Sequence, residues 1–330
     1  MKNGIIANLP VGPKFNGGAM TVWGIISAIK KKNEKIFLIL ICEKNFKKNI
    51  FNECKNILEN NNIDYEIIYF EEKKKNFFHK IKNFINSYLY SSPDYFFLEQ
   101  KKLNNKIKKI FLRENFDKIY CYHFDALSAC YEQKDQNIIC CMGDLMHEPR
   151  NKRRLMNEIN FLNLLINKFE ERLSLKITLK ILSNFKNVGF YANHYYEKIK
   201  IKRSNINFFK TSIIPPNSRI NYPKTNLQIN KILLVGDLSG TVTISSLLFL
   251  KNFLKNNSDE FLKNYIFKII GGGNISKKIE TLSNFNNVSF VGALDDMSQE
   301  FDNQSILLAC NTIDVGIRVR VITALSYGLI

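Results

Sequence analysis

Short apolar runs alternate with segments of helical spacing along most of this 330-residue chain. Apolar residues at 22, 25, 26 and 29 have the spacing of an amphipathic helix within 19–31. Strands that alternate with helices form βαβ units, which favour a mainly parallel sheet. The expected fold class is therefore α/β. In the first half the expected strands are GIIANL (4–9), KIFLILIC (35–42), YEIIYF (65–70), KIYCYHF (118–124), NIICCM (137–142) and NVGFYAN (187–193).

The alternation restarts after a proline-rich stretch. Residues 211–230 hold three of the seven prolines and no helical period, which is typical of a linker. We expect two Rossmann-like halves: an N-terminal domain over 1–215, a linker over 216–230 and a smaller C-terminal domain over 231–330. A last helix is expected from Arg320 through Ser326. The strands expected in the second half are KILLVGDL (231–238), YIFKIIGGG (265–273), NVSFVGAL (287–294) and SILLAC (305–310).

The composition argues against a membrane-spanning or secreted protein. The longest strongly apolar runs, such as IFLILIC (36–42), are far shorter than the roughly 20 residues of a membrane-spanning helix. Pro10, Gly12 and Pro13 interrupt the N-terminal apolar patch before it could form a signal-peptide core. Seven scattered cysteines show neither a CxxC pair nor zinc spacing, so we expect buried reduced thiols and no metal. A cytoplasmic protein is expected.

The net charge of +18 would suit nucleic acid, an anionic membrane or phosphorylated substrates. Much of the excess positive charge comes from lysine, and asparagine and isoleucine are also abundant. An AT-rich genome produces this composition. The positions of the charged residues are therefore more informative than the net charge. Residues 73–90 carry an aromatic and aliphatic stripe beside lysines. This segment is either an amphipathic helix on the inner face of an anionic membrane or a helix packed on the sheet. No nucleic-acid recognition motif accompanies it.

Three glycine loops are candidates for phosphate or nucleotide binding. A glycine-rich turn from strand to helix lets backbone N–H groups approach a phosphate. Gly17 and Gly18 lie in such a turn in the first half of the chain, and Gly236 lies in such a turn in the second half. Gly271 to Gly273, with Gly272 at the centre, follow a strand at its carboxyl end, where open α/β sheets place ligands. The alternative for each is a tight turn without a ligand.

Arg318 and Arg320 precede a helix and alternate with apolar residues in GIRVRVITALSYG. Guanidinium groups can neutralise a diphosphate through forked hydrogen bonds, and a helix N-terminus adds to the effect. The alternative is a pair of exposed arginines on an edge strand.

Asp144 and His147 follow another expected strand in CMGDLMHEPRNKRR. Either could act as a general base toward a substrate hydroxyl. His123 is a parallel candidate at the end of the fourth strand. A solvated or helix-capping side chain is the alternative in each case.

The NGG loop, SIIPPNS, ILLVGDL, FKIIGGG, VSFVGAL and VGIRVRVITALSYG follow one another in the chain. In this order they resemble the retaining nucleotide-sugar glycosyltransferases of the GT-B fold, group 1 or family 4. The resemblance implies two Rossmann-like domains facing a cleft. It also implies metal-independent hexosyl transfer from a nucleoside-diphosphate sugar to a surface polysaccharide or lipid-linked glycan, with no cofactor besides the donor.

Three departures from the family pattern qualify this resemblance. Thr323 stands where the family has a Glu that holds a sugar or ribose hydroxyl. Asp237 follows Gly236 where the family has an Arg. The chain also ends before the family's P-V-V strand, so the second domain is expected to be incomplete and this truncated chain to be a weak enzyme. Two alternatives therefore stay open: a non-catalytic or degenerate glycosyltransferase-like binding protein (a gene fragment), and a nucleotide-sugar 2-epimerase.

Overall fold

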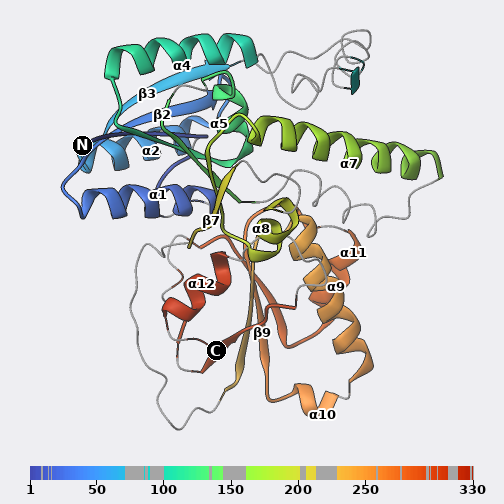
Figure 1. Cartoon of the computed structure of the whole chain (residues 1–330). Coiled ribbons are helices and arrows are strands. Elements are labelled where there is room, and N and C mark those ends of the chain that lie inside the picture. Colours follow the sequence, from blue (N-terminus) through green and yellow to red (C-terminus); the bar gives the residue numbers. More distant parts are fainter. Residues whose placement is uncertain are drawn as a thin grey trace. The chain divides into compact units, whose positions relative to one another are not determined.

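In the computed structural model, the chain forms two compact units, Met1–Pro216 and Asn217–Ile330 (Figure 1). The expected linker at 216–230 falls mostly outside the described residues and stays a prediction. The structure describes all residues except 9, 14, 16, 71–84, 86–87, 90–99, 134–135, 144–160, 201–205, 213–228, 258, 276, 295–296, 298, 303, 311–318, 328 and 330.

Unit 1 contains a seven-stranded parallel sheet in the order β3-β2-β1-β4-β5-β6-β7. The central strand β1 pairs with β2 on one side and with β4 on the other, so that Ile5 lies beside both Leu38 and Tyr120. The described strands are β1 (Lys2–Asn8), β2 (Lys35–Glu43), β3 (Asp64–Phe70), β4 (Lys118–Tyr122), β5 (Ile138–Met142), β6 (Asn187–Phe190) and β7 (Asn207–Lys210).

Helices cover both faces of this sheet because alternate strand residues point to opposite sides. Leu38 and Leu40 pack with helices α1 and α2 in one core cluster, whereas Ile39 and Ile41 pack with α4, α5 and α7 in another. The described helices of unit 1 are α1 (Gly17–Lys30), α2 (Lys48–Asn60), α4 (Gln100–Glu114), α5 (His123–Cys130), α7 (Phe161–Leu182) and α8 (Asn193–Lys200).

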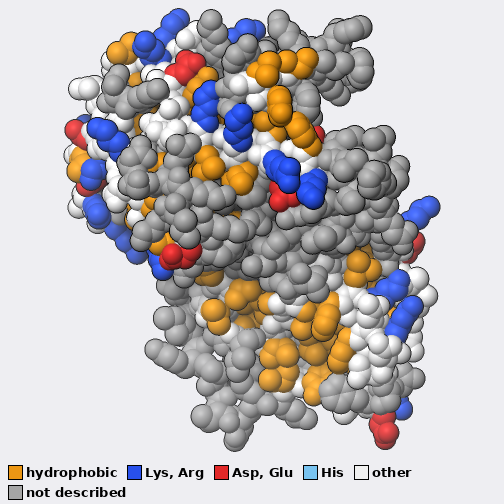
Figure 2. All heavy atoms as spheres, turned by 45° about the vertical axis from the view of Figure 1, so that its right-hand side comes forward, with side chains coloured by type: hydrophobic (Ala, Val, Ile, Leu, Met, Phe, Trp, Pro, Cys, Tyr) orange, Lys and Arg blue, Asp and Glu red, His pale blue; other side chains and the backbone are white. Residues whose placement is uncertain are grey.

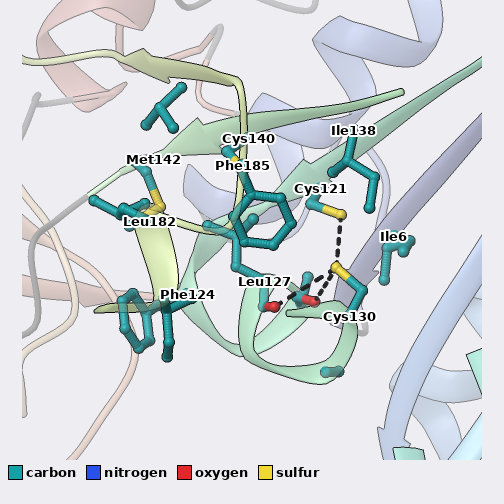
Figure 3. Packing of buried hydrophobic residues seen from close by; sticks show 14 of the residues in the cluster. Ile6, Cys121, Phe124, Leu127, Cys130, Ile138, Cys140, Met142, Leu182 and Phe185 are labelled. Atoms are coloured by element: carbon teal, nitrogen blue, oxygen red, sulfur yellow. Dashed lines mark hydrogen bonds between the residues drawn. The ribbon is translucent and has the colours of Figure 1, made fainter. Parts of the chain in front are cut away.

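The cysteines belong to the core. All seven are free; six are buried and Cys310 is half-buried. Figure 3 shows Cys121 of β4 facing Cys130 of α5, with the two sulfur atoms 3.3 Å apart. Burial raises the pKa of the Cys121 and Cys140 thiols well above the ordinary value. The prediction of buried free thiols is therefore confirmed for six of the seven cysteines.

Unit 2 contains a smaller parallel sheet of four strands in the order β10-β9-β8-β11. One face packs under α9 through Leu234, Leu247 and Ile269, and the other packs under α12 through Leu233 and Ala324. The described elements are β8 (Lys231–Val235), α9 (Thr241–Asn256), α10 (Asp259–Leu262), β9 (Ile266–Ile270), α11 (Lys277–Glu280), the 3₁₀ turn η2 (Thr281–Asn284), β10 (Val288–Gly292), β11 (Ser305–Leu307) and α12 (Val319–Ser326).

The expected α/β class with two parallel sheets, the second one smaller, is confirmed. The expected final helix is also present as α12. Several boundaries differ from the expectation. The strand expected at 118–124 ends at Tyr122, because His123 has a left-handed φ of 69° that an extended strand cannot contain. SILLAC is strand only over Ser305–Leu307, and β7 had no counterpart among the expected strands.

Candidate functional site

In unit 2, two loops meet at the carboxyl edge of the sheet. Strands β8 and β9 are parallel and in register, with Val235 beside Ile270, so the segments that follow them lie side by side. The N–H of Gly236 donates to the carbonyl of Ile270 (2.9 Å), and the N–H of Leu238 donates to the carbonyl of Gly272 (2.8 Å). The loop 236–240 and the loop 271–273 therefore form one continuous backbone edge.

The close approach of the two loops explains why two of these positions are glycine. A Cβ on Gly271 would lie 1.7 Å from the carbonyl oxygen of Gly236, so no side chain fits at that position. Gly273 has a left-handed φ of 105°, and a Cβ there would meet the Asp237 carboxylate at 2.6 Å. The sequence singled out Gly272, which is exposed and has its nearest neighbour 3.6 Å away. The close approach is made by Gly271 and Gly273, the other two glycines of the expected loop.

Asp237 is held within its own turn. One carboxylate oxygen accepts hydrogen bonds from the backbone N–H of Ser239 (3.0 Å) and from its hydroxyl (2.6 Å). This local bonding closes the turn that leads into α9, whose N-terminal cap is Gly240. The acid is thus used to shape the loop that the sequence singled out for phosphate binding.

Arg320 lies at the same edge. From the first turn of α12 its Nη1 donates a hydrogen bond to the carbonyl oxygen of Val235, the last residue of β8. A Cβ on Gly236 would lie 2.5 Å from this nitrogen and 2.4 Å from Oγ1 of Thr243. The missing side chain of Gly236 is what leaves room for the guanidinium. The structure therefore brings Arg320 and Gly236 together, whereas Arg318 lies outside the described residues.

Thr323 is one turn further along α12. Its hydroxyl donates to the carbonyl oxygen of Val319 at 3.0 Å, a bond within the helix. Threonine commonly makes this bond in helices, and here it uses the hydroxyl's only proton.

In unit 1, the described candidates also lie at carboxyl strand ends. Gly17 and Gly18 are the first two residues of α1, both half-buried, after the loop that follows β1. The hydroxyl of Thr21 donates to the carbonyl of Gly17 (2.8 Å), which fixes the first turn. The end of β1 is also joined to α5, since the Asn8 amide donates to the Asp125 carboxylate at 2.8 Å.

His123 stands at the junction of β4 and α5 in the left-handed region. Its ring centroid lies 5.9 Å from that of Tyr122, and a Cβ on Gly143 would lie 3.2 Å from its Cδ2. The imidazole therefore packs against the residue that directly precedes Asp144. Asp144 and His147 themselves lie outside the described residues.

Tyr122, whose ring lies beside His123, has Cys141 and Tyr191 as neighbours, and both of these groups are neutral at physiological pH. Burial raises the pKa of Cys141 to about 12 and moves the pKa of Tyr191 far above the ordinary range. The Tyr191 ring lies 6.2 Å from Tyr122. Among the residues that the structure describes, no cluster of three or more His, Cys, Asp or Glu could hold a metal ion.

No protein-family model and no curated protein sequence matches the chain. Solved structures do match its fold. A trehalose-6-phosphate synthase from E. coli bound with UDP-2-fluoro glucose is 12% identical, with a TM-score of 0.61, 99% of this chain covered and 82% of that one. WaaG, a glycosyltransferase involved in lipopolysaccharide biosynthesis, is 14% identical, with a TM-score of 0.56. The match covers 100% of this chain and 80% of WaaG.

The pneumococcal O-GlcNAc transferase GtfA in complex with UDP and GlcNAc is 9% identical, with a TM-score of 0.61 and coverage of 100% and 83%. Identities this low establish shared architecture and leave the reaction open. Each match extends over both units and over four fifths or more of the other chain. The chain therefore has the fold of the GT-B glycosyltransferases.

Proposed function

We propose that this protein is a glycosyltransferase that moves a hexosyl group from a nucleoside-diphosphate sugar to a polysaccharide or lipid-linked glycan acceptor. The observation that carries the proposal is the position of Arg320. Its guanidinium lies at the carboxyl edge of β8, beside Gly236 and the loops that precede α9. Ligands of open parallel sheets bind at this edge, and a fixed cation suits a diphosphate.

The donor would bind to unit 2. Backbone N–H groups of the glycine loops and the helix N-terminus of α9 supply donors for phosphate oxygens, and Arg320 supplies charge. The structural neighbours bound with UDP or a UDP-sugar make a uridine nucleotide the first donor to try. Arg318 would complete the cationic pair, and Gly17 with Gly18 stay candidates for phosphate binding on unit 1.

The acceptor would bind to unit 1, with His123 at its centre. The imidazole could accept a proton from an acceptor hydroxyl or steady the developing positive charge on the sugar. Asp144 and His147 follow the residue against which His123 packs, so they are proposed for the same region. Transfer with retention and without a metal follows the resemblance to the retaining family.

A titration and a turnover assay together test this function. Isothermal titration calorimetry with UDP and with GDP measures donor-site binding, and a panel of nucleotide sugars with and without glycan acceptors measures hydrolysis and transfer. We expect one nucleotide to bind and its sugar to be released or transferred. Absence of nucleotide binding in a monodisperse sample would contradict the proposal.

The second candidate is a glycosyltransferase-like binding protein without catalysis. Thr323 favours it, because its hydroxyl proton is engaged within α12 and the side chain carries no charge. Nucleotide binding without any release of sugar, with or without acceptor, would decide for this candidate.

A peripheral site on an anionic membrane suits a lipid-linked acceptor. From the stripe at 73–90, the structure describes Ile85, Tyr88 and Leu89, which are 47%, 53% and 57% exposed. The Tyr88 ring lies 5.5 Å from that of Phe169, itself 36% exposed. On the face drawn in Figure 2, hydrophobic side chains of unit 1 gather beside lysines and arginines. No helix among the described residues is long and apolar enough to span a bilayer.

A further inference from the structure

The thiol of Cys54 in α2 forms hydrogen bonds with the loop that follows β1. Its sulfur accepts a hydrogen bond from the backbone N–H of Val11 (3.4 Å) and donates one to the carbonyl oxygen of the same residue (3.2 Å). Both residues are 0% exposed, so the contact lies in the core between α2 and the loop. A buried cysteine that only filled space would not need to face both polar groups of one backbone residue.

This contact imitates the pairing of neighbouring strands. Within a strand, the N–H and the C=O of one residue point to the same side, and both bond to the residue opposite. Val11 lies beyond the end of β1, and the Cys54 thiol takes the place of that opposite residue. An unpaired N–H or carbonyl in the core costs free energy, so the thiol fixes the path of the loop as it leaves the sheet.

The thiol must stay protonated to form both bonds, because a thiolate can accept a hydrogen bond but cannot donate one. Burial raises the pKa of Cys54 above its ordinary value, and this effect exceeds the opposing effect of the hydrogen bond with Val11. The protonated thiol is therefore the form present at physiological pH. A serine hydroxyl could form the same pair of bonds, whereas alanine could form neither.

The next residues of the loop also lie against α2. A Cβ on Gly12 would be 2.8 Å from Cε2 of Phe15 and 3.2 Å from Cδ1 of Ile57. Ile57 follows Cys54 by three positions, so both face the loop from one side of α2. The Phe15 ring packs against the core cluster that contains Val11 and Cys54. The first part of the loop is thus held by contacts with α2.

The far end of the same loop begins α1, where the Thr21 hydroxyl donates to the carbonyl oxygen of Gly17 at 2.8 Å. Helices α1 and α2 pack on the same face of the sheet, in one core cluster (Figure 1). The loop from Val11 to Gly17, described except for residues 14 and 16, is therefore held at its start by α2 and at its end by α1. Gly17 and Gly18 are the phosphate-binding candidates of unit 1.

We propose that Cys54 is a positioning residue for nucleotide binding, which fixes the backbone of Val11 and thereby the loop that presents Gly17 and Gly18 to the phosphates of a nucleoside diphosphate. This inference rests on the proposed function, since it takes a nucleotide as the ligand. Because Cys54 is fully buried, its thiol acts through the loop and not on the ligand. A loop that already has its bound shape loses less conformational entropy when the ligand binds.

Titration calorimetry of the full chain with UDP and with GDP tests the proposal. Cys54→Ala removes both hydrogen bonds to Val11 and should weaken binding of the preferred nucleotide about tenfold. Cys54→Ser keeps a group that both donates and accepts, so its affinity should stay within about threefold of the original chain. Rescue by serine separates the hydrogen bonds from the size of the side chain.

The matched control is Cys130→Ala. It removes another fully buried thiol that donates to a backbone carbonyl, that of Ala126 at 3.2 Å, but this bond lies within α5. Its nucleotide affinity should equal that of the original chain. Circular dichroism and urea unfolding verify the fold of each variant.

Steady-state kinetics distinguish positioning from a loss of folded protein. With the sugar of the nucleotide that binds, Cys54→Ala should raise the KM for the donor about tenfold and leave kcat within about twofold. A partly unfolded sample would instead lower the apparent kcat and leave KM unchanged, since only the concentration of competent molecules falls.

Three results would overturn this inference alone. The first is a Cys54→Ala variant that binds the nucleotide as tightly as the original chain. The second is equal weakening in Cys54→Ala and Cys54→Ser, and the third is a lowered kcat with unchanged KM, which would assign Cys54 to the fold only. If the original chain binds neither UDP nor GDP, the proposed function fails and this inference fails with it.

Discussion

The Arg320 guanidinium donates a hydrogen bond to the backbone carbonyl oxygen of Val235, 85 positions earlier in the chain. This contact ties the start of α12 to the carboxyl end of β8, where the glycine loop begins. It gives Arg320 two expected roles. One is structural, because it satisfies a half-buried carbonyl, and the other is the proposed binding of a diphosphate.

Arg320→Ala should weaken UDP or GDP binding by about 1–3 kcal/mol, and Arg318→Ala should do the same, as expected for charged hydrogen bonds. Arg320→Ala should also lower the free energy of unfolding of unit 2 by about 1–3 kcal/mol, since the Val235 carbonyl loses its donor. Titration calorimetry measures the affinity, and Arg113→Ala on unit 1 is the control. Unchanged affinity in both Arg318 and Arg320 variants would count against phosphate contact.

Two neighbouring glycines should respond differently to alanine. Gly271→Ala places a methyl group 1.7 Å from the Gly236 carbonyl oxygen, so the two loops must separate. We expect a loss of about 2–4 kcal/mol in stability. Gly272→Ala meets nothing nearer than 3.6 Å and should stay within about 0.5 kcal/mol of the original chain. Urea unfolding of the two variants measures the difference, and similar stabilities would show that the close approach is not maintained in solution.

His123→Asn should separate chemistry from folding. Asparagine tolerates the left-handed φ of 69°, so stability should change by less than about 1 kcal/mol. Sugar transfer should fall on the order of 100-fold, because asparagine cannot accept a proton. Nucleotide affinity should be unaffected. The assay is initial-rate transfer with the donor that binds, and full activity of the variant would remove His123 from the mechanism.

Asp302 should make unit 2 sensitive to acid. Burial acts to raise its pKa, but hydrogen bonds from Lys231, Ser305 and the Gln304 backbone outweigh this and hold the pKa below the ordinary value. The stabilisation is therefore fully present above the pKa of an unfolded aspartate, about 3.9, and is lost as the pH falls through the lower folded pKa. Because the side chain is 42% exposed, the contribution is only about 0.5–1 kcal/mol.

Asp302→Asn should consequently destabilise unit 2 at pH 7 and should destabilise it less near pH 3. Hydrogen exchange of the β8 and β11 amides measures this. The chain's single tryptophan, Trp23, lies in α1, so its fluorescence reports unit 1 and should be unchanged at both pH values. A variant that is equally destabilised at both pH values would rule out the ionic contribution.

The sequence by itself determined the architecture. Apolar runs such as KIFLILIC are typical of strands buried on both faces of a parallel sheet, and the helical spacing at 22, 25, 26 and 29 predicts a covering helix. These signals are local, since each depends on residues within one element. For the same reason the sequence located α12 and the glycine loops, and it identified the cysteines as core residues.

Only the tertiary structure decided which candidates meet. Arg320 reaches Val235 across 85 positions, and Gly271 must be glycine because the Gly236 backbone lies against it. The ending of β4 at His123 and the engagement of Asp237 by Ser239 likewise depend on backbone geometry. No periodic pattern encodes such contacts. They arise when parallel strands far apart in the sequence bring their carboxyl ends to one edge.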